Sequence, residues 1–119
     1  MKSGLNMKFK KPPNFTDKEF IEWLQRWVLV NSWLYYEKDG APVSDKDYDS
    51  VSRQLVSLQK SYSKDIKDTQ YGYAFYDFDA STGFYLYYRL SDADKEKIVQ
   101  VASHVMQVYI SNNNKKRKR

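Results

Sequence analysis

Residues 35–49 read YYEKDGAPVSDKDYD, and this stretch decides the fold because it separates two helical patterns. Gly40 and Pro42 interrupt the pattern before them, since glycine and proline are unfavourable inside a helix. Ser44 stands three residues before Asp47, which is typical of an N-cap followed by an acid in the first helical turn. The stretch therefore predicts one helix that ends before Gly40 and a second that starts after Ser44.

The predicted first helix begins in a capping box and has apolar residues on more than one face. Thr16 is suited to the N-cap, and Glu19 stands at the third helical position. Apolar side chains then recur at helical spacing at Phe20, Trp23, Leu24, Trp27, Val28, Leu34 and Tyr35. Val30 and Trp33 fall outside that stripe, so we expect the helix, which should run to about Glu37, to be contacted on more than one side.

The predicted second helix has one narrow apolar stripe. Its members are three or four residues apart, at Tyr48, Val51, Leu55, Leu58 and Tyr62. Such a stripe is typical of packing against a single partner helix, and the simplest partner is the first helix. We therefore expect an antiparallel helical hairpin over residues 15–62.

Residues 71–88 differ in composition, because nine of these 18 residues are Tyr or Phe. Aromatic residues favour strands, and residues 79–83, Asp-Ala-Ser-Thr-Gly, are typical of a hairpin loop. We predict two antiparallel strands, 73–78 and 84–89, within a β-hairpin over residues 71–89. A third helix is predicted over residues 91–111, with Ser91 as its N-cap. The predicted fold class is α+β, mostly α.

The basic residues are concentrated at the two ends of the chain. All five residues from Lys115 to Arg119 are basic, whereas eleven basic and fifteen acidic residues lie between Phe15 and Asn114, a net charge of −4. We expect a single domain, residues 15–111, between a flexible basic leader at 1–14 and a basic tail at 112–119.

The composition excludes several kinds of chemistry. The sequence has no cysteine, so disulfides and thiol nucleophiles are absent. His104 is the only histidine and has no second ligand at metal spacing, so no metal site is expected. No apolar run approaches the length of a membrane span, and nothing resembles a signal peptide. We expect a cytoplasmic protein with no membrane partner.

The start of the second helix carries the best candidate site. Asp45, Tyr48 and Asp49 are spaced i, i+3 and i+4, so they share one face of the helix. The intervening loop can bring Tyr35 opposite them. Two phenol rings that face each other can sandwich a flat, electron-poor ring, and two carboxylates beside them can accept hydrogen bonds from ribose hydroxyls or from a carboxamide. The alternative is a purely structural role, in which both acids complement the helix dipole and Tyr48 belongs to the core.

The motif from Tyr35-Tyr36 through Ser44-Asp45 to Tyr48-Asp49 resembles the nicotinamide-recognising N-terminal subdomain of NAD-dependent DNA ligases. The resemblance implies that Tyr35 and Tyr48 hold the nicotinamide ring, while Asp45 and Asp49 hold the ribose and the amide. Tyr36 stands where this family often has histidine. The cofactor implied is NAD, through its nicotinamide mononucleotide moiety.

The resemblance does not extend to the catalytic chemistry of that family. Those ligases attach AMP to the lysine of a Lys-x-Asp-Gly motif in a larger domain, whereas Lys38-Asp39-Gly40 lacks the intervening residue. We therefore expect no catalytic residue and no enzyme activity from this chain alone. The implied partner is a ligase catalytic chain or a host DNA ligase, in a split ligase or as a modulator, and an isolated subdomain of this kind suits a bacteriophage.

Two other functions remain open from the sequence. The first is a nucleic-acid-binding accessory protein that uses the aromatic hairpin and the basic ends, with non-specific DNA contact through Lys115, Lys116, Arg117, Lys118 and Arg119. The aromatic strand partly matches RNA-recognition motifs, but no strand precedes the first helix, as that fold requires. The second is a protein-interaction module whose ligase-like site binds no ligand.

Overall fold

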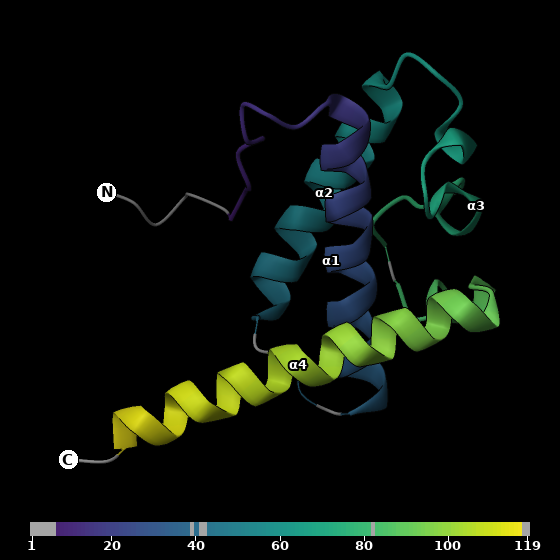
Figure 1. The fold of residues 1–119 in the computed structure, drawn as a ribbon. Helices are drawn as coiled ribbons and strands as arrows, with labels where there is room; N and C mark the ends of the chain where they lie inside the picture. The colour runs from purple at the N-terminus through teal and green to yellow at the C-terminus, as the bar shows by residue number, and fades with distance from the viewer. Residues whose placement is uncertain (1–6, 39, 41–42, 82, 118–119) are drawn as a thin grey trace.

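The computed structural model describes residues 7–38, 40, 43–81 and 83–117. Three long helices, α1 (Asp17–Glu37), α2 (Asp45–Ser61) and α4 (Asp92–Arg117), form its frame. A short helix, α3 (Gly72–Phe75), and two 3-10 turns, η1 (Ile66–Asp68) and η2 (Tyr87–Arg89), complete it. α2 runs antiparallel along α1, and α4 crosses α1 toward the end of α1 that joins α2 (Figure 1).

The N-termini of the long helices are set by the predicted caps. The Thr16 side chain accepts a hydrogen bond from the Glu19 backbone at 3.1 Å, and the Glu19 carboxylate accepts one from the Thr16 backbone at 2.8 Å. Ser44 caps α2 through the backbone N–H of Asp47, at 3.1 Å. The predicted capping box and the predicted helical hairpin are confirmed.

α1 is the central helix, as its two apolar faces predicted. It contacts both α2 and α4, and its fully buried side chains include Leu24, Val28 and Leu29. Val30, which lies outside the main stripe, is also buried. A helix that is apolar on more than one side must be covered on more than one side, and α4 supplies the second cover.

The predicted β-hairpin is wrong. Among the residues that the structure describes, none is in a strand, and the molecule is helical. Residues 72–75 form α3, in which the backbone N–H groups of Ala74 and Phe75 donate to the Tyr71 carbonyl. The segment 84–89 forms a turn and then η2. The fold class is therefore all-α in the described residues, not α+β.

Burial of the aromatic segment explains why it forms a helical turn and not a strand. Tyr71, Ala74 and Phe75 are spaced i, i+3 and i+4, and all three are buried, so a helical turn places them together against the core. A Cβ on Gly72 would overlap the backbone of Ile66, so this turn packs directly on η1. Tertiary packing overrides the preference of aromatic residues for strands.

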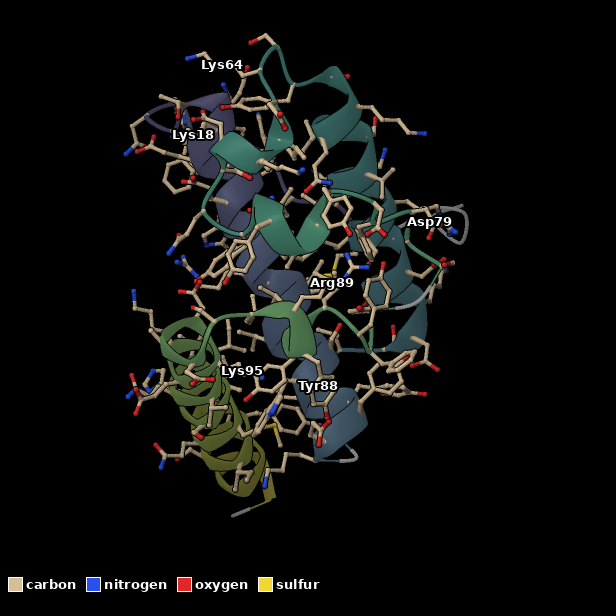
Figure 2. The ribbon with its side chains drawn as sticks, turned by 90° about the vertical axis from the view of Figure 1, so that its right-hand side faces the viewer. Lys18, Lys64, Asp79, Tyr88, Arg89 and Lys95 are labelled. Atoms are coloured by element: carbon tan, nitrogen blue, oxygen red, sulfur yellow. The ribbon has the colours of Figure 1, made fainter. Side chains whose placement is uncertain are left out.

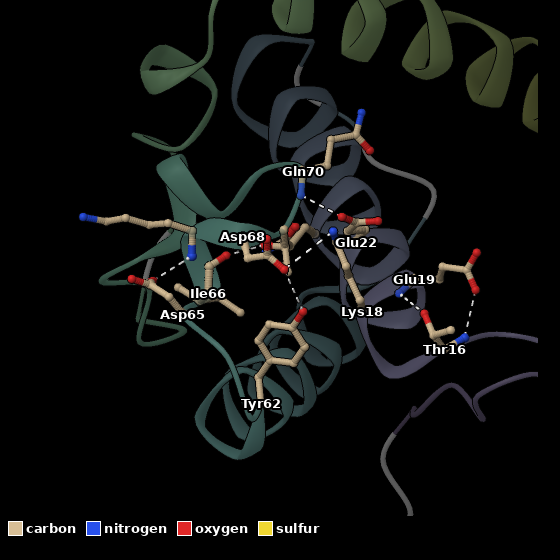
Figure 3. Close-up of polar contacts among 12 residues, drawn as sticks. Thr16, Lys18, Glu19, Glu22, Tyr62, Asp65, Ile66, Asp68 and Gln70 are labelled. Carbon is tan, nitrogen blue, oxygen red and sulfur yellow. Dashed lines mark hydrogen bonds and ion pairs between the residues drawn. The ribbon is translucent and has the colours of Figure 1, made fainter.

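A buried amide connects three segments of the chain. The Gln25 side chain is fully buried and donates at 3.0 Å to both Gln59 and Thr69, while its oxygen accepts from the Tyr71 backbone at 3.3 Å. Nearby, the Gln70 backbone donates to Glu22 at 2.8 Å (Figure 3). These bonds fix the 66–75 segment against α1 and α2, because a buried polar group left without a partner is costly.

Part of the predicted leader lies along the helices. The backbone of Phe9 exchanges two hydrogen bonds with the Gln54 side chain, at 3.0 and 2.7 Å. Its ring meets Trp23 edge to face, with centroids 4.8 Å apart. Residues 1–6 lie outside the described residues.

α4 begins at the body and runs past it. Ile98 and Ala102 are fully buried, whereas Val108, Tyr109 and Ile110 are between 42% and 51% exposed. Figure 1 shows the C-terminal part of this helix extending away from α1 and α2. No helix in the described part of the chain combines the length and the apolar character needed to cross a bilayer.

Candidate functional site

One cavity of about 160 Å³ lies where α1 ends and α2 begins. It is lined by Asn31, Tyr35, Tyr36, Val43, Asp45, Tyr48, Asp49, Ala80 and Ser81. All five candidate residues from the sequence, which come from both helix ends, therefore line the same cavity. Sites that enclose a whole drug-sized ligand span roughly 300–1,000 Å³, so this cavity suits a single ring with its substituents.

Tyr48 forms a fixed wall of this cavity. Its hydroxyl is hydrogen-bonded to the Ser32 hydroxyl on α1, and its ring lies nearly parallel to Trp27, with centroids 6.3 Å apart and planes 20° apart. Burial raises the pKa of the Tyr48 hydroxyl above its ordinary value of 10.0, so the phenol is neutral at physiological pH. A ring held by a hydrogen bond and a second ring can present a rigid surface to a ligand.

Tyr35 and Tyr36 form the exposed wall. Each is 47% exposed, and their rings meet edge to face with centroids 4.8 Å apart. Tyr36 also contacts Phe84, at 6.1 Å between centroids. Tyr35 therefore packs against its neighbour, and both Tyr35 and Tyr48 face the cavity.

The rim of the cavity is acidic. Asp45 is the first residue of α2 and is exposed, and Asp49 lies one turn later. Asp49 forms an ion pair with Arg53 at 2.5 Å, so part of its charge is compensated. In the described part of the chain Asp45 forms no ion pair. Asp45 is therefore the less compensated acceptor at this site.

The third side of the cavity comes from the loop that the sequence placed in a hairpin. The Asp79 carboxylate accepts hydrogen bonds from the backbone and the hydroxyl of Ser81, at 3.0 and 2.6 Å. Between them, Ala80 has a φ of 71°, a left-handed conformation that costs about 1–2 kcal/mol for an L-residue. Sequence reasoning found this loop but not its position, because Ala80 and Ser81 reach the cavity only through the tertiary fold.

Gly83 seats this loop on the fixed wall. A Cβ at this position would overlap the Tyr48 hydroxyl and would lie 2.7 Å from the Ser32 hydroxyl. The backbone at Gly83 therefore approaches the Tyr48–Ser32 pair as closely as the absence of a side chain allows. No local sequence signal predicts this contact.

Asn31 is a further residue that sequence reasoning missed. It lies one turn before Tyr35 on α1, is only 5% exposed, and borders the cavity. Its amide nitrogen donates to the Trp27 carbonyl at 2.9 Å, while its Oδ1 is buried without a partner among the described residues. A polar residue in an otherwise apolar helix segment is the only signal that could have drawn attention to it.

A second, larger groove of about 440 Å³ adjoins this cavity between α1 and α4. Its walls include Trp23, Trp27 and Val101, and it shares Asn31 and Val43 with the first cavity. The groove is mainly apolar and has one cationic side chain, Arg26. It contains none of the residues singled out from the sequence for binding.

Two aromatic residues of the 71–89 segment, Tyr76 and Tyr85, lie against Arg89. Its guanidinium lies 5.0 Å from the ring centroid of Tyr76 and 4.5 Å from that of Tyr85, and it forms two hydrogen bonds with Asp77, at 2.6 and 3.1 Å. The hydrogen bonds from Arg89 lower the pKa of Asp77. Figure 2 shows Arg89 in the middle of this face and Tyr88 beside Lys95 of α4. These cations cover ring faces that stacked bases would need.

The basic tail is only partly described. Lys115, Lys116 and Arg117 continue α4, and Lys118 and Arg119 lie outside the described residues. Contact between this tail and nucleic acid stays a prediction.

The fold and the site together define a small helical protein with an aromatic, acid-rimmed cavity between two helix ends. One similar protein is a DNA ligase of Citrifermentans bemidjiense (strain ATCC BAA-1014 / DSM 16622 / JCM 12645 / Bem), which is 38% identical over 42 residues. That match covers 35% of this chain and 6% of the ligase. No family model matches the chain, and no solved structure matches it significantly. A region of this chain is therefore similar to a small part of a DNA ligase.

Proposed function

We propose that this protein recognises the nicotinamide mononucleotide half of NAD and acts with, or on, a DNA ligase catalytic chain. The observation that carries the proposal is the cavity lined by Tyr35, Tyr36, Asp45, Tyr48 and Asp49. The similarity to part of a DNA ligase over 42 residues supports the choice of a ligase as the partner.

The ring-binding step uses the two tyrosine walls. The nicotinamide ring of NAD is flat and cationic, and a cation is attracted to the face of an aromatic ring. Tyr48 is fixed by Ser32 and Trp27, so it offers a ready surface. Tyr35 is half exposed and closes on the other face of the ligand.

The ribose and the charge of the ring are matched by the carboxylates. Carboxylate oxygens accept hydrogen bonds from ribose hydroxyls, and Asp45 is free to do so at the cavity rim. Asp49 is partly compensated by Arg53, so its contribution is directional hydrogen bonding to the ligand amide more than net charge. Two acids beside a cationic ring also favour that ring over a neutral one.

The partner step follows from what such a site can accomplish. Holding the nicotinamide mononucleotide half fixes the direction in which it leaves when AMP is transferred to a lysine on another chain. The protein then serves as the small subunit of a split ligase, or it occupies the same surface of a complete ligase and interferes with it. Both versions require a ligase catalytic chain as the partner, and a bacteriophage source suits both.

The direct test is an NMR titration of isotope-labelled protein with nicotinamide mononucleotide at concentrations up to the millimolar range. We expect shifts centred on Tyr35, Asp45, Tyr48 and Asp49, with a Kd of about 1 mM, or about −4 kcal/mol, because only one ring is enclosed. Asp45→Ala should abolish these shifts.

Asp47→Ala is the matched control. Asp47 stands in the same first turn of α2 but does not line the cavity, so it has the same relation to the helix dipole. If both variants lose binding equally, the effect comes from the helix and not from the site. If the wild-type protein shows no shifts at all, nucleotide recognition by this chain alone is wrong.

A separate experiment tests the partner. Co-purification with a ligase catalytic chain, for wild type and for Asp45→Ala with Tyr48→Phe, distinguishes a working site from an idle one. Under our proposal, NAD strengthens the complex with wild type only. If neither NAD nor the substitutions change the strength of the complex, the surface serves only for protein contact.

A further inference from the structure

Two buried side-chain atoms of the described residues have no hydrogen-bond partner, Oδ1 of Asn31 and Oγ of Ser52, and of these two residues only Asn31 lines the cavity. The residue is 5% exposed, and Oδ1 is buried with no hydrogen-bond partner among the described residues. A buried polar atom without a partner costs free energy that an apolar side chain of the same shape would avoid. An apolar residue would therefore stabilise this position more than asparagine does, if packing were its only role.

The orientation of this amide is fixed by chemistry. The atom within 2.9 Å of the Trp27 carbonyl must be the amide nitrogen, because a carbonyl oxygen can only accept. A flipped amide would set two acceptors against each other. The Asn31 atom without a partner is therefore an acceptor and not a donor.

We propose, on the basis of the proposed function, that Asn31 makes this site specific for a ring carboxamide over a ring carboxylate. The NH₂ of a primary amide donates to Asn31 Oδ1. A carboxylate at the same place has no proton to donate and meets a lone pair instead, within reach of the negative charges of Asp45 and Asp49.

The position of Asn31 suits this role. It lies one turn before Tyr35 on the same helix and lines the same cavity, so a ring stacked beside Tyr35 directs a substituent toward it. Oδ1 is buried in the free protein, so the contact requires a side-chain rearrangement in the cavity wall when the ligand binds. Tyr35 is 47% exposed and packs on Tyr36, so its side chain can change rotamer. Such rotamer changes are common on binding.

The experiment compares two ligands and three proteins. Nicotinamide mononucleotide and nicotinic acid mononucleotide differ only in amide against acid, and both are titrated into wild type, Asn31→Leu and Asn112→Leu. Leucine is close to asparagine in shape, and Asn112 is exposed on α4. Asn31→Ala is the second variant if Asn31→Leu does not fold, and circular dichroism with thermal unfolding checks every protein.

The expected result is a change in selectivity. Wild type prefers the amide at least about 10-fold, and Asn31→Leu binds it about 5- to 10-fold more weakly, as expected for one lost hydrogen bond. The affinity for the acid stays the same or rises, so the ratio of the two dissociation constants falls. Asn112→Leu behaves as wild type.

Three results would overturn the inference, and they are distinct. If wild type binds neither nucleotide, the proposed function fails and this inference fails with it. If wild type binds both equally, or Asn31→Leu binds each nucleotide as tightly as wild type does, only the role of Asn31 is wrong. If Asn31→Leu weakens both ligands by the same factor, Asn31 supports the shape of the cavity and does not select the ligand.

Discussion

Replacing Gly83 with alanine tests whether the 79–83 loop is seated on the wall of the cavity. The new Cβ would overlap the Tyr48 hydroxyl and lie 2.7 Å from the Ser32 hydroxyl. Both oxygens belong to side chains that hold each other in place, so neither can yield without breaking their hydrogen bond. The φ of Gly83 is not positive, so alanine causes no backbone strain there, and the clash alone determines the effect.

The magnitude follows from the cost of overpacking. Inserting a methyl group into a filled space costs about 1–3 kcal/mol. In a domain of this size each kcal/mol lowers Tm by about 4 °C, so Gly83→Ala should lower Tm by about 4–12 °C. Thermal unfolding followed by circular dichroism measures this directly.

Two further proteins make the result specific. Gly40→Ala is the matched control, because its nearest neighbour among the described residues, the Lys38 carbonyl, is 4.0 Å from the new Cβ, and we expect a Tm equal to wild type or slightly higher. Tyr48→Phe removes the overlapped oxygen, so Gly83→Ala should cost about 1 kcal/mol less in that background than alone. Equal costs in the two backgrounds, or equal Tm values for the two glycine variants, would refute the placement of the loop.

Three other predictions concern stability and the basic tail. Thr16→Ala removes one half of the capping box and should lower the free energy of unfolding by about 1 kcal/mol, measured by urea unfolding; no loss would mean that the first turn of α1 does not depend on its cap. Gln25→Leu leaves Thr69 and the Tyr71 backbone without their partner, so we expect a loss of about 2–4 kcal/mol in the same assay, and a neutral result would contradict the buried network. Deleting residues 115–119 should leave the nucleotide titration unchanged. If nucleotide binding is lost, the ligand site lies closer to the tail than we propose. If DNA binding is lost in a gel-shift assay, the nucleic-acid alternative is supported.

Tyr48 also predicts a dependence on pH. Its folded pKa is raised by burial above the ordinary 10.0, so its neutral form contributes stability that is full below pH 10 and is lost as the pH rises through the folded value. Tyr48→Phe cannot ionise and should lose less stability over that range in urea unfolding at increasing pH. Parallel curves for the two proteins would show that Tyr48 ionises as freely in the folded state as in the unfolded chain.

Local signals in the sequence predicted the long helices well. Thr16 and Ser44 determine where α1 and α2 begin, and their caps involve only residues three positions away. The break around Gly40 separates α1 from α2. Interactions between residues three positions apart can be predicted from the sequence alone.

The aromatic segment could not be predicted in the same way. The positions of Tyr71, Ala74 and Phe75 fit a helical turn only once the core is known to lie on that side, and the contact of Gly72 with Ile66 is tertiary. The residues of the candidate site also fall into a part that the sequence predicts and a part that it does not. Its two helix ends follow from sequence spacing, but Ser81 and the other loop residues arrive from a distant segment.

The outer part of α4 has a consequence for how this protein unfolds. Beyond Ala102 the helix has less and less of the core beneath it, and Val108, Tyr109 and Ile110 are about half exposed. An unsupported helix is marginal in water, so these turns open and close independently of the body, with little protection of their amides against hydrogen exchange. Heating should therefore produce a gradual loss of helical signal before the main transition, and the two processes belong to different cooperative units of one continuous helix.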